Sequence, residues 1–325
     1  MFNALVLEQQ DKKTIAAIKP INLDDLYQGD VVVKVSYSSL NYKDGLAITG
    51  AGKIIRNFPM VPGIDFSGVV HFSEHPKYQV GDEVILTGWG VGETHPGGMA
   101  EFARVKGDWL VPMPKGCDGL KAMQIGTAGL TAALCVQALV DHGITPEQGP
   151  ILVTGASGGV GSTSVALLAK LGYEVVAVSG RSSNHEYLKS LGATQILARD
   201  EFDIDGRPLD KQKWAGVVDT VGNKVLATAL TQINYGGAAA ICGLAGGFAL
   251  PTTVMPFILR GVCLLGIDSV YCPYSKRLAA WKFALDNLGE DYFKQATTLV
   301  SLSDVEQQAQ DIVAGKVTGR VAVKL

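Results

Sequence analysis

The residues best suited to chemistry begin at a glycine-rich turn. Ile151 to Thr154 form a short apolar run that predicts a buried parallel strand, and apolar residues from Val160 onward recur at helical spacing. The turn between them contains Gly155, Gly158, Gly159 and Gly161. Glycine lets the backbone approach a phosphate, and the helix N-terminus offers N–H groups to an anion. This order indicates a dinucleotide-phosphate site, with an ordinary tight turn as the alternative. The expected contacts are Ser157, Gly158, Gly159, Val160 and Gly161.

The end of the next predicted strand, residues 173–178, indicates which dinucleotide binds. A fold of this type that prefers NAD carries Asp or Glu there, to hold the ribose 2′-hydroxyl. This sequence instead has Ser179, Gly180 and Arg181, and hydroxyl and guanidinium groups can bind a 2′-phosphate. We therefore expect NADPH, with the alternative that Arg181 is a solvated loop cation. Arg199, further on, either reaches the same phosphate or the adenine, or is an ordinary surface arginine.

Length and composition limit the class of protein. A chain of 325 residues exceeds what one hydrophobic core usually supports, so two domains are expected. Its 47% hydrophobic content and 39 glycines suit a folded α/β enzyme. The formal net charge of −3 gives no electrostatic reason to expect nucleic acid or an anionic membrane as a partner. No apolar run approaches the length of a membrane span, and we expect a soluble cytoplasmic protein.

The predicted elements change character along the chain. Residues up to about 115 alternate short apolar and polar runs punctuated by glycine and proline, which indicates a small β-rich domain. A helix predicted at 120–139 leads into alternating strand and helix signals, which favour a doubly wound parallel sheet. Further strands are predicted at 215–219, 238–242 and 262–267. A helix near 277–288 precedes a final strand at 320–325, which is expected to return to the first domain.

Several longer motifs resemble one family along essentially the whole chain. They are residues 39–44 (Ser-Leu-Asn-Tyr-Lys-Asp), 52–59, 62–68, 86–92 and 251–260, together with the phosphate turn at 156–161. In these motifs the sequence resembles the acrylyl-CoA reductase (NADPH) family, long described as putative quinone oxidoreductases. That family lies in the zinc-independent branch of the medium-chain dehydrogenase/reductase superfamily. The resemblance implies an α/β fold with a Rossmann-type, doubly wound parallel sheet and a β-rich GroES-like catalytic domain. The implied ranges are 1–121 for the catalytic domain, 122–270 for the NADPH-binding domain and 271–325 for a return to the catalytic domain.

Two departures from the zinc alcohol dehydrogenases indicate a metal-free site. Those enzymes place a cysteine near Asn41 and a His-Glu pair where this chain has Ile64 and Asp65. They also carry a lobe of closely spaced cysteines where this chain, from 88 to 98, has His95 alone. Zinc needs several nitrogen or sulfur ligands at matched geometry. We therefore expect no bound metal.

Without a Lewis acid, reduction of a double bond conjugated to a carbonyl is the accessible chemistry. Hydride would add to the β-carbon, the carbonyl oxygen would need a hydrogen-bond donor, and the α-carbon would need a proton. The resemblance implies Asn41, Tyr42 and Asp44 as catalytic candidates, with Tyr42 also touching the nicotinamide. Alternatively, Tyr42 is a core-edge aromatic, and Asp44, like Asp65, holds a loop by local hydrogen bonds.

Further residues are implied on the substrate and cofactor sides. A CoA thioester would need cations for its phosphates, and Lys43, Lys53 and Arg56 are the candidates unless they are simply solvated. Leu244, in a glycine-containing loop, is expected to contact the nicotinamide ring, and Ile258 is implied at the other edge of that ring. The loop around Leu244 could equally be an ordinary strand-to-loop turn.

Three functions follow from these residues and the resemblance. The leading one is NADPH-dependent reduction of acrylyl-CoA to propionyl-CoA by hydride transfer to the β-carbon without metal. A quinone oxidoreductase would use the same cofactor site with a flat acceptor, and a crystallin-like protein would bind nucleotide without catalysis. The candidate cations favour a phosphorylated substrate, whereas the mildly acidic charge disfavours nucleic acid. The expected partners are a small-molecule substrate and, by the resemblance, a second copy in a homodimer, with no membrane.

Overall fold

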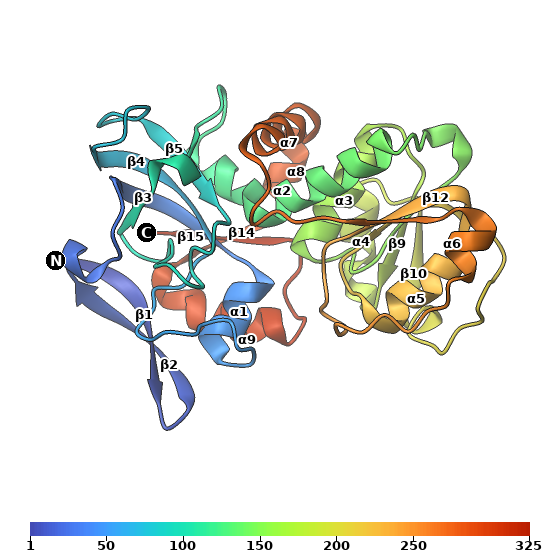
Figure 1. Cartoon of the computed structure of the whole chain (residues 1–325), viewed down its shortest axis with the longest axis horizontal. Coiled ribbons are helices and arrows are strands. Elements are labelled where there is room, and N and C mark those ends of the chain that lie inside the picture. Colours follow the sequence, from blue (N-terminus) through green and yellow to red (C-terminus); the bar gives the residue numbers. More distant parts are fainter. The chain divides into compact units, whose positions relative to one another are not determined.

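The computed structural model describes residues 1–325, which form two compact units (Figure 1). Unit 1 contains residues 1–127, 269–278 and 296–325, and unit 2 contains residues 128–268 and 279–295. The sequence-based ranges placed all of 271–325 with the first domain, whereas 279–295 groups with unit 2. The buried hydroxyl of Tyr292 shows why, because it lies 2.6 Å from the hydroxyl of Thr163 in unit 2.

Unit 2 is built on a six-stranded parallel sheet with the order β10-β9-β8-β11-β12-β13. The strands predicted at 151–154, 173–178, 215–219, 238–242 and 262–267 all lie in this sheet. Every residue of β8, β9 and β11 is buried, as in sheets covered on both faces. The strands are β8 Ile151–Val153, β9 Val175–Ser179, β10 Gln195–Ala198, β11 Trp214–Asp219, β12 Ile233–Ile241 and β13 Cys263–Gly266. The helices are α3 Gly159–Lys170, α4 His185–Ser190, α5 Asn223–Thr231, α6 Met255–Arg260 and α8 Glu290–Gln295.

Unit 1 contains a seven-stranded sheet and a two-stranded hairpin. The sheet order is β14-β15-β3-β4-β5-β7, with β6 also paired to β3, and the hairpin joins β1 to β2. The strands are β1 Phe2–Gln10, β2 Lys13–Ile21, β3 Val31–Leu40, β4 Asp65–Ser73, β5 Glu83–Thr87, β6 Phe102–Val105, β7 Val111–Pro112, β14 Thr297–Ser301 and β15 Arg320–Lys324. The predicted final strand does return to the first unit, because β15 lies between β14 and β3.

Two helices of unit 1, α1 (Tyr42–Thr49) and α9 (Val305–Val313), lie side by side below this sheet in Figure 1. Gly45 permits their close approach, because a Cβ there would lie 2.5 Å from a methyl group of Ile312. Val305 and Ala309 of α9 are fully buried at i,i+4 spacing. The short α1 was not predicted from the sequence, yet it carries most of the catalytic candidates.

Helix α2 (Gly119–Asp141) contains the boundary between the two units at residue 127, and α7 (Tyr274–Asn287) contains another at residue 278. By length and composition α2 is apolar enough to cross a membrane, but 72% of its most apolar window is buried within the protein. That burial is the pattern of a core helix. Gly126, with φ 52° and ψ −158°, interrupts α2 with a kink.

Candidate functional site

The phosphate turn lies at the carboxyl end of β8 and leads directly into α3. Gly158 is the N-cap of α3, and the first N–H groups of a helix have no partner within it. Gly155 has a φ of 56°, and a Cβ at Gly161 would lie 2.3 Å from the Gly155 carbonyl oxygen. Both positions therefore require glycine, which keeps the turn compact and open to an anion. Ser157 and Val160 are half-buried in the same turn.

The turn stands where the strand order reverses, between β8 and β11. The Thr154 hydroxyl, after β8, donates to the buried Asp219 carboxylate, at the end of β11, at 2.6 Å. Thr220 adds a bond from its N–H to the Thr154 hydroxyl at 3.1 Å and one from its hydroxyl to the Thr154 carbonyl at 3.0 Å. Burial raises the pKa of Asp219, while hydrogen bonds from the Thr154 hydroxyl and from the Gly222 and Val221 N–H groups oppose the rise. Doubly wound sheets bind ligands at such a switch point.

The structure brings Arg181 and Arg199 to one edge of the sheet. They follow β9 and β10, which are adjacent parallel strands with paired last residues. The Arg199 side chain lies over Gly180, where an added Cβ would be 3.7 Å from the Arg199 Cβ. Arg199 also pairs with Asp203 at 3.5 Å on the exposed surface. Because residues 179–183 contain no carboxylate, this edge suits a phosphate better than a free ribose hydroxyl.

Leu244 and Ile258 are both exposed, by 63% and 71% of their surface. The loop that carries Leu244 is tightly held, because a Cβ at Gly243 would lie 2.1 Å from the Thr220 carbonyl oxygen. The Gly246 N–H also donates to the Val221 carbonyl at 2.8 Å. The loop is thus fixed against the segment after β11, and the Leu244 side chain remains available to a ligand.

In unit 1, the first turn of α1 carries Tyr42 and Asp44, and Asn41 is its N-cap. The Asn41 N–H donates to Asp44 Oδ2 at 2.9 Å, which stabilises the start of the helix. Tyr42 is 39% exposed, and its hydroxyl has no hydrogen-bond partner within the protein. Tyr42 is therefore the candidate of the three whose donor remains available to a substrate.

Asp44 is buried, and its carboxylate is occupied by backbone groups. Besides the Asn41 N–H, it accepts the N–H groups of Gly63 at 3.1 Å and Ile64 at 3.0 Å. Burial, and then repulsion from Asp65, raise the pKa of Asp44 to about 7, while the N–H donors oppose the rise. These contacts support the loop-holding role that the sequence left open, rather than a catalytic one.

The side chain of Asn41 is also engaged by buried partners. Its Nδ2 donates to Asp65 Oδ2 at 3.0 Å, and its Oδ1 accepts from Arg320 Nη1 at 3.1 Å. The expectation that Asn41 orients a substrate carbonyl therefore has no support in this geometry. Arg320 and the neighbouring Ser39 were missed in the sequence, since 279 residues separate Arg320 from Asn41. The signal available in the sequence was that Arg320, a charged residue, is the first residue of an apolar strand.

The three candidate cations differ in their surroundings. Lys43 forms an ion pair with Glu93 at 2.8 Å, and both side chains are partly buried. Lys53 and Arg56 are exposed on the segment that follows α1. Lys43 is thus already neutralised, which leaves Lys53 and Arg56 as the cations open to an anionic group.

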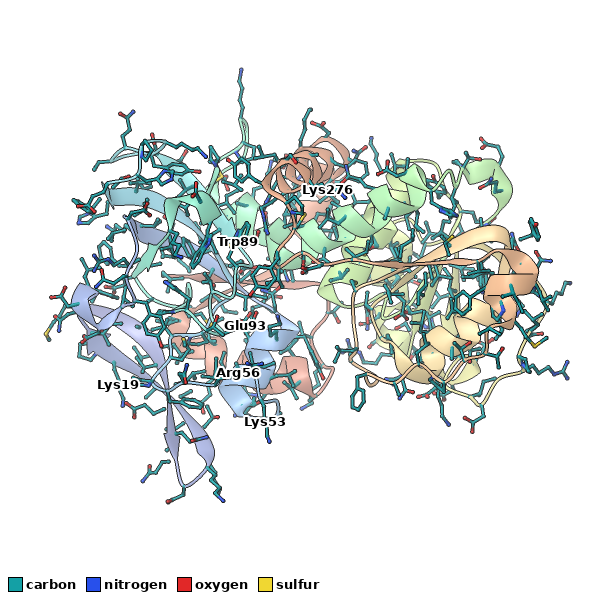
Figure 2. The ribbon with its side chains drawn as sticks, viewed as in Figure 1. Lys19, Lys53, Arg56, Trp89, Glu93 and Lys276 are labelled. Carbon is teal, nitrogen blue, oxygen red and sulfur yellow. The ribbon has the colours of Figure 1, made fainter.

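Glu93 stands on a glycine-containing loop, residues 88–95, that is anchored by a buried arginine. Arg277 donates to the Thr87 carbonyl at 2.8 Å and the Val270 carbonyl at 3.0 Å. Its guanidinium carbon lies 5.1 Å from the centre of the Trp89 ring, within cation–π range. Figure 2 shows Trp89 and Glu93 on this loop. The Arg277 contacts hold the start of the loop in place, and Glu93 pairs with Lys43 of α1.

The residues present do not fit a zinc ion. No three or more His, Cys, Asp or Glu side chains converge anywhere in the chain in a way that could hold a metal. Asn41 and Asp65 bond each other and the surrounding polar groups, and the His95 Nδ1 lies 3.1 Å from the Pro96 carbonyl. Tetrahedral zinc would need several nitrogen or sulfur donors at one point.

Comparison with known proteins identifies the family. Residues 27–115 match the family described as alcohol dehydrogenase GroES-like domain, and 159–286 match zinc-binding dehydrogenase. The probable acrylyl-CoA reductase AcuI of Escherichia coli (strain K12) is 62% identical over 324 residues, covering 100% of both chains. The chain belongs to the acrylyl-CoA reductase family. Acrylyl-CoA reductase AcuI of Ruegeria pomeroyi is 54% identical over 99% of each chain.

A solved structure is equally similar across the whole fold. The crystal structure of the yhdH oxidoreductase from Salmonella enterica, in complex with NADP, has a TM-score of 0.98 and 62% identity, covering 99% of both chains. Members of this acrylyl-CoA reductase family belong to the medium-chain dehydrogenase/reductase superfamily. The predicted combination of a GroES-like domain and a Rossmann-type parallel sheet is confirmed.

Proposed function

We propose that the protein catalyses the NADPH-dependent reduction of acrylyl-CoA to propionyl-CoA. The observation that carries the cofactor half is the switch-point turn beside Arg181, with no carboxylate in 179–183. Full-length similarity to two acrylyl-CoA reductases supports the substrate half. We further propose that the enzyme is cytoplasmic and homodimeric.

The cofactor residues have distinct proposed tasks. When bound, NADPH supplies a hydride. The backbone of residues 157–161 would hold its pyrophosphate at the start of α3, and Arg181, with Arg199, would bind the 2′-phosphate. Ser179 shapes this edge, because its hydroxyl lies 3.4 Å from the Arg181 N–H. Leu244 and Ile258 would offer apolar surface to the nicotinamide ring.

Tyr42 is the residue that we propose touches the reacting group. Hydride addition at the β-carbon of a thioester leaves negative charge on the carbonyl oxygen. The unbonded Tyr42 hydroxyl would donate a hydrogen bond to that oxygen and could pass a proton onward to the α-carbon. Lys53 and Arg56 would bind the CoA phosphates, while the paired Lys43 would do so only if Glu93 releases it.

The deciding experiment compares acceptors. Purified protein should consume NADPH far faster with acrylyl-CoA than with a benzoquinone. The amount of propionyl-CoA formed should equal the amount of NADPH consumed. Equal or reversed rates would point instead to a quinone oxidoreductase. Tight NADPH binding without turnover of either acceptor would indicate a nucleotide-binding protein.

A second experiment tests Tyr42 itself. Tyr42→Phe keeps the ring and should lower kcat about 10²- to 10³-fold, the usual effect of losing one oxyanion donor. The binding of NADPH should change much less. Tyr235→Phe is a matched control, because Tyr235 is 78% exposed in unit 2 and has no proposed role.

A further inference from the structure

The feature behind this inference is a buried charge pair whose members do not touch. Asp65 and Arg320 are respectively 0% and 2% exposed. The Arg320 guanidinium bonds Ser39 Oγ at 2.7 Å and Asn41 Oδ1 at 3.1 Å instead of the carboxylate. Ser39 and Asn41 in turn donate to Asp65 at 2.6 and 3.0 Å. Two neutral side chains therefore bridge a buried cation and a buried anion.

Each bridge uses both hydrogen-bonding capacities of its side chain. The Ser39 hydroxyl donates to the anion and accepts from the cation, and the Asn41 amide does the same with its two ends. Buried charges are tolerated only where such bonds compensate their lost hydration. The orientation of the Asn41 amide is consequently fixed, because turning it over would place a donor against Arg320 and an acceptor against Asp65.

The kink of α2 forms one wall of the network. Arg320 donates to the Gln124 carbonyl at 3.2 Å, and the Thr127 N–H donates to Asp65 Oδ2 at 2.8 Å. A Cβ at Gly126 would lie 2.4 Å from Arg320 Nη2 and 2.8 Å from Ser39 Oγ. The kink therefore places backbone hydrogen-bonding partners beside both Arg320 and Asp65 and leaves no room for a side chain at residue 126.

Asn41 connects this network to the reacting group, because it is the N-cap of α1 and immediately precedes Tyr42. We infer that Ser39, Asp65 and Arg320 are positioning residues that fix Tyr42 through the clamped side chain of Asn41. The inference deepens the proposed function, since it rests on Tyr42 meeting the substrate. None of the three positioning residues touches substrate or cofactor in this scheme.

The test uses Ser39→Ala and a matched control, Ser38→Ala. Both serines are fully buried on β3, but the Ser38 hydroxyl donates only to the Asp65 backbone carbonyl, at 2.7 Å. Ser39→Ala should lower kcat with acrylyl-CoA about tenfold and leave the KM for NADPH within about twofold. Ser38→Ala should leave kcat within about twofold. Equal losses in both variants would overturn the inference.

A double-mutant cycle distinguishes positioning from general damage. If Ser39 acts through Tyr42, Ser39→Ala should lower kcat by less than twofold further once Tyr42→Phe is present. If the reduction in kcat of the double variant equals the product of the two single-variant reductions, the inference is contradicted. Asn41→Ser provides a second route if Ser39→Ala folds poorly, because serine is a good N-cap but cannot bridge both charges.

A readout independent of turnover separates this inference from the proposed function. In the full-length protein labelled with ¹³C-tyrosine, the Tyr42 signal is assigned by its loss in Tyr42→Phe. That signal should shift or broaden in Ser39→Ala and Asn41→Ser but not in Ser38→Ala. An unchanged signal in both would overturn the inference even if the enzyme reduces acrylyl-CoA. A shifted signal in a protein that lacks this activity would uphold the positioning and refute the function.

Discussion

Arg181 and Tyr42 are the single residues on which the proposed chemistry depends most directly. Each was identifiable in the sequence because it occupies a position next to a recognisable local pattern. Arg181 follows an apolar strand where an acid would signal NAD, and Tyr42 lies in a motif shared with the family. Arg320, which bonds the neighbouring Asn41 from 279 residues away, had no comparable signal.

Arg181→Ala should raise the KM for NADPH and leave the use of NADH almost unchanged. Loss of a hydrogen bond to a charged group costs about 1.5–3 kcal/mol, or about 10- to 100-fold in affinity. Steady-state kinetics with both cofactors measure the difference. Arg207→Ala, at another exposed arginine of unit 2, should alter neither constant. An equal rise in the KM for NADPH and for NADH would show that Arg181 does not bind the 2′-phosphate.

Asp44 should make unit 1 less stable as the pH rises. Its pKa in the folded state is about 7, compared with 3.8 when unperturbed, so the folded protein holds the proton more strongly. The stabilisation is complete below pH 4 and is lost as the pH rises through about 7, with a total on the order of 4 kcal/mol. Urea unfolding at pH 4.5 and 7.5 should show this loss in the natural protein.

Asp44→Asn should flatten that pH dependence while lowering stability at acidic pH. The asparagine oxygen can still accept from Gly63 and Ile64, but the NH₂ group that replaces Oδ2 cannot accept the Asn41 N–H, so about 1 kcal/mol should be lost. Asp286→Asn, at an exposed carboxylate paired with Lys282, should keep the pH dependence of the natural protein. Parallel curves for the natural protein and Asp44→Asn would show that Asp44 does not hold a raised pKa.

At the scale of elements, the phosphate turn combines two different requirements for glycine. At Gly161 a side chain would collide with the turn itself, whereas at Gly158 the nearest atom to an added Cβ is the Gly155 carbonyl oxygen at 3.4 Å, an ordinary contact. Gly161 is thus needed for folding of the turn. Gly158 needs to be glycine only if a ligand comes close.

Gly161→Ala should therefore destabilise unit 2 by about 3 kcal/mol, as expected when a methyl group is forced into a packed site. Gly158→Ala should cost about 1 kcal/mol or less. It should nevertheless weaken NADPH binding at least tenfold, because its methyl group would occupy the approach to the phosphate. Thermal unfolding and titration calorimetry on the two variants separate these effects. Normal NADPH binding by Gly158→Ala would mean that the pyrophosphate lies elsewhere.

The same scale shows what the sequence could and could not predict. β8, β9 and β11 were recognisable because their apolar runs are short, contiguous and bounded by turn residues. Helix α1 was not, since eight residues containing a glycine give little periodicity, and α9 holds it in place from more than 250 residues away. Lys43 seemed free in the sequence because no neighbouring residue indicates its ion pair with Glu93, which lies 50 residues further along the chain.

At the scale of the whole molecule, unit 1 is discontinuous whereas most of unit 2 is a single segment. Val323 of β15 is fully buried, and β15 lies between β14 and β3. Val323→Asp should bury an unpaired carboxylate and destabilise unit 1 by several kcal/mol. The parallel sheet of unit 2 contains no part of β15 and should keep most of its stability.

Hydrogen exchange measured by mass spectrometry can check this division. Val323→Asp should lose amide protection in β3 and β14 but retain it in β8 to β12. Lys324→Asp, at the exposed end of the same strand, should resemble the natural protein. Uniform loss of protection in both units would show that they unfold as one cooperative body.

The interior place of β15 also sets an order of events during synthesis on the ribosome. β3 ends at Leu40, but its neighbour on one side begins only at Arg320. At about 5 to 20 residues per second, roughly a quarter of a minute or more separates their emergence. During that interval β3 has an open edge, and the charges around Asn41 lack their arginine. The segment 128–268 can complete its own sheet meanwhile, so the nucleotide-binding half is expected to mature before the half that carries Tyr42.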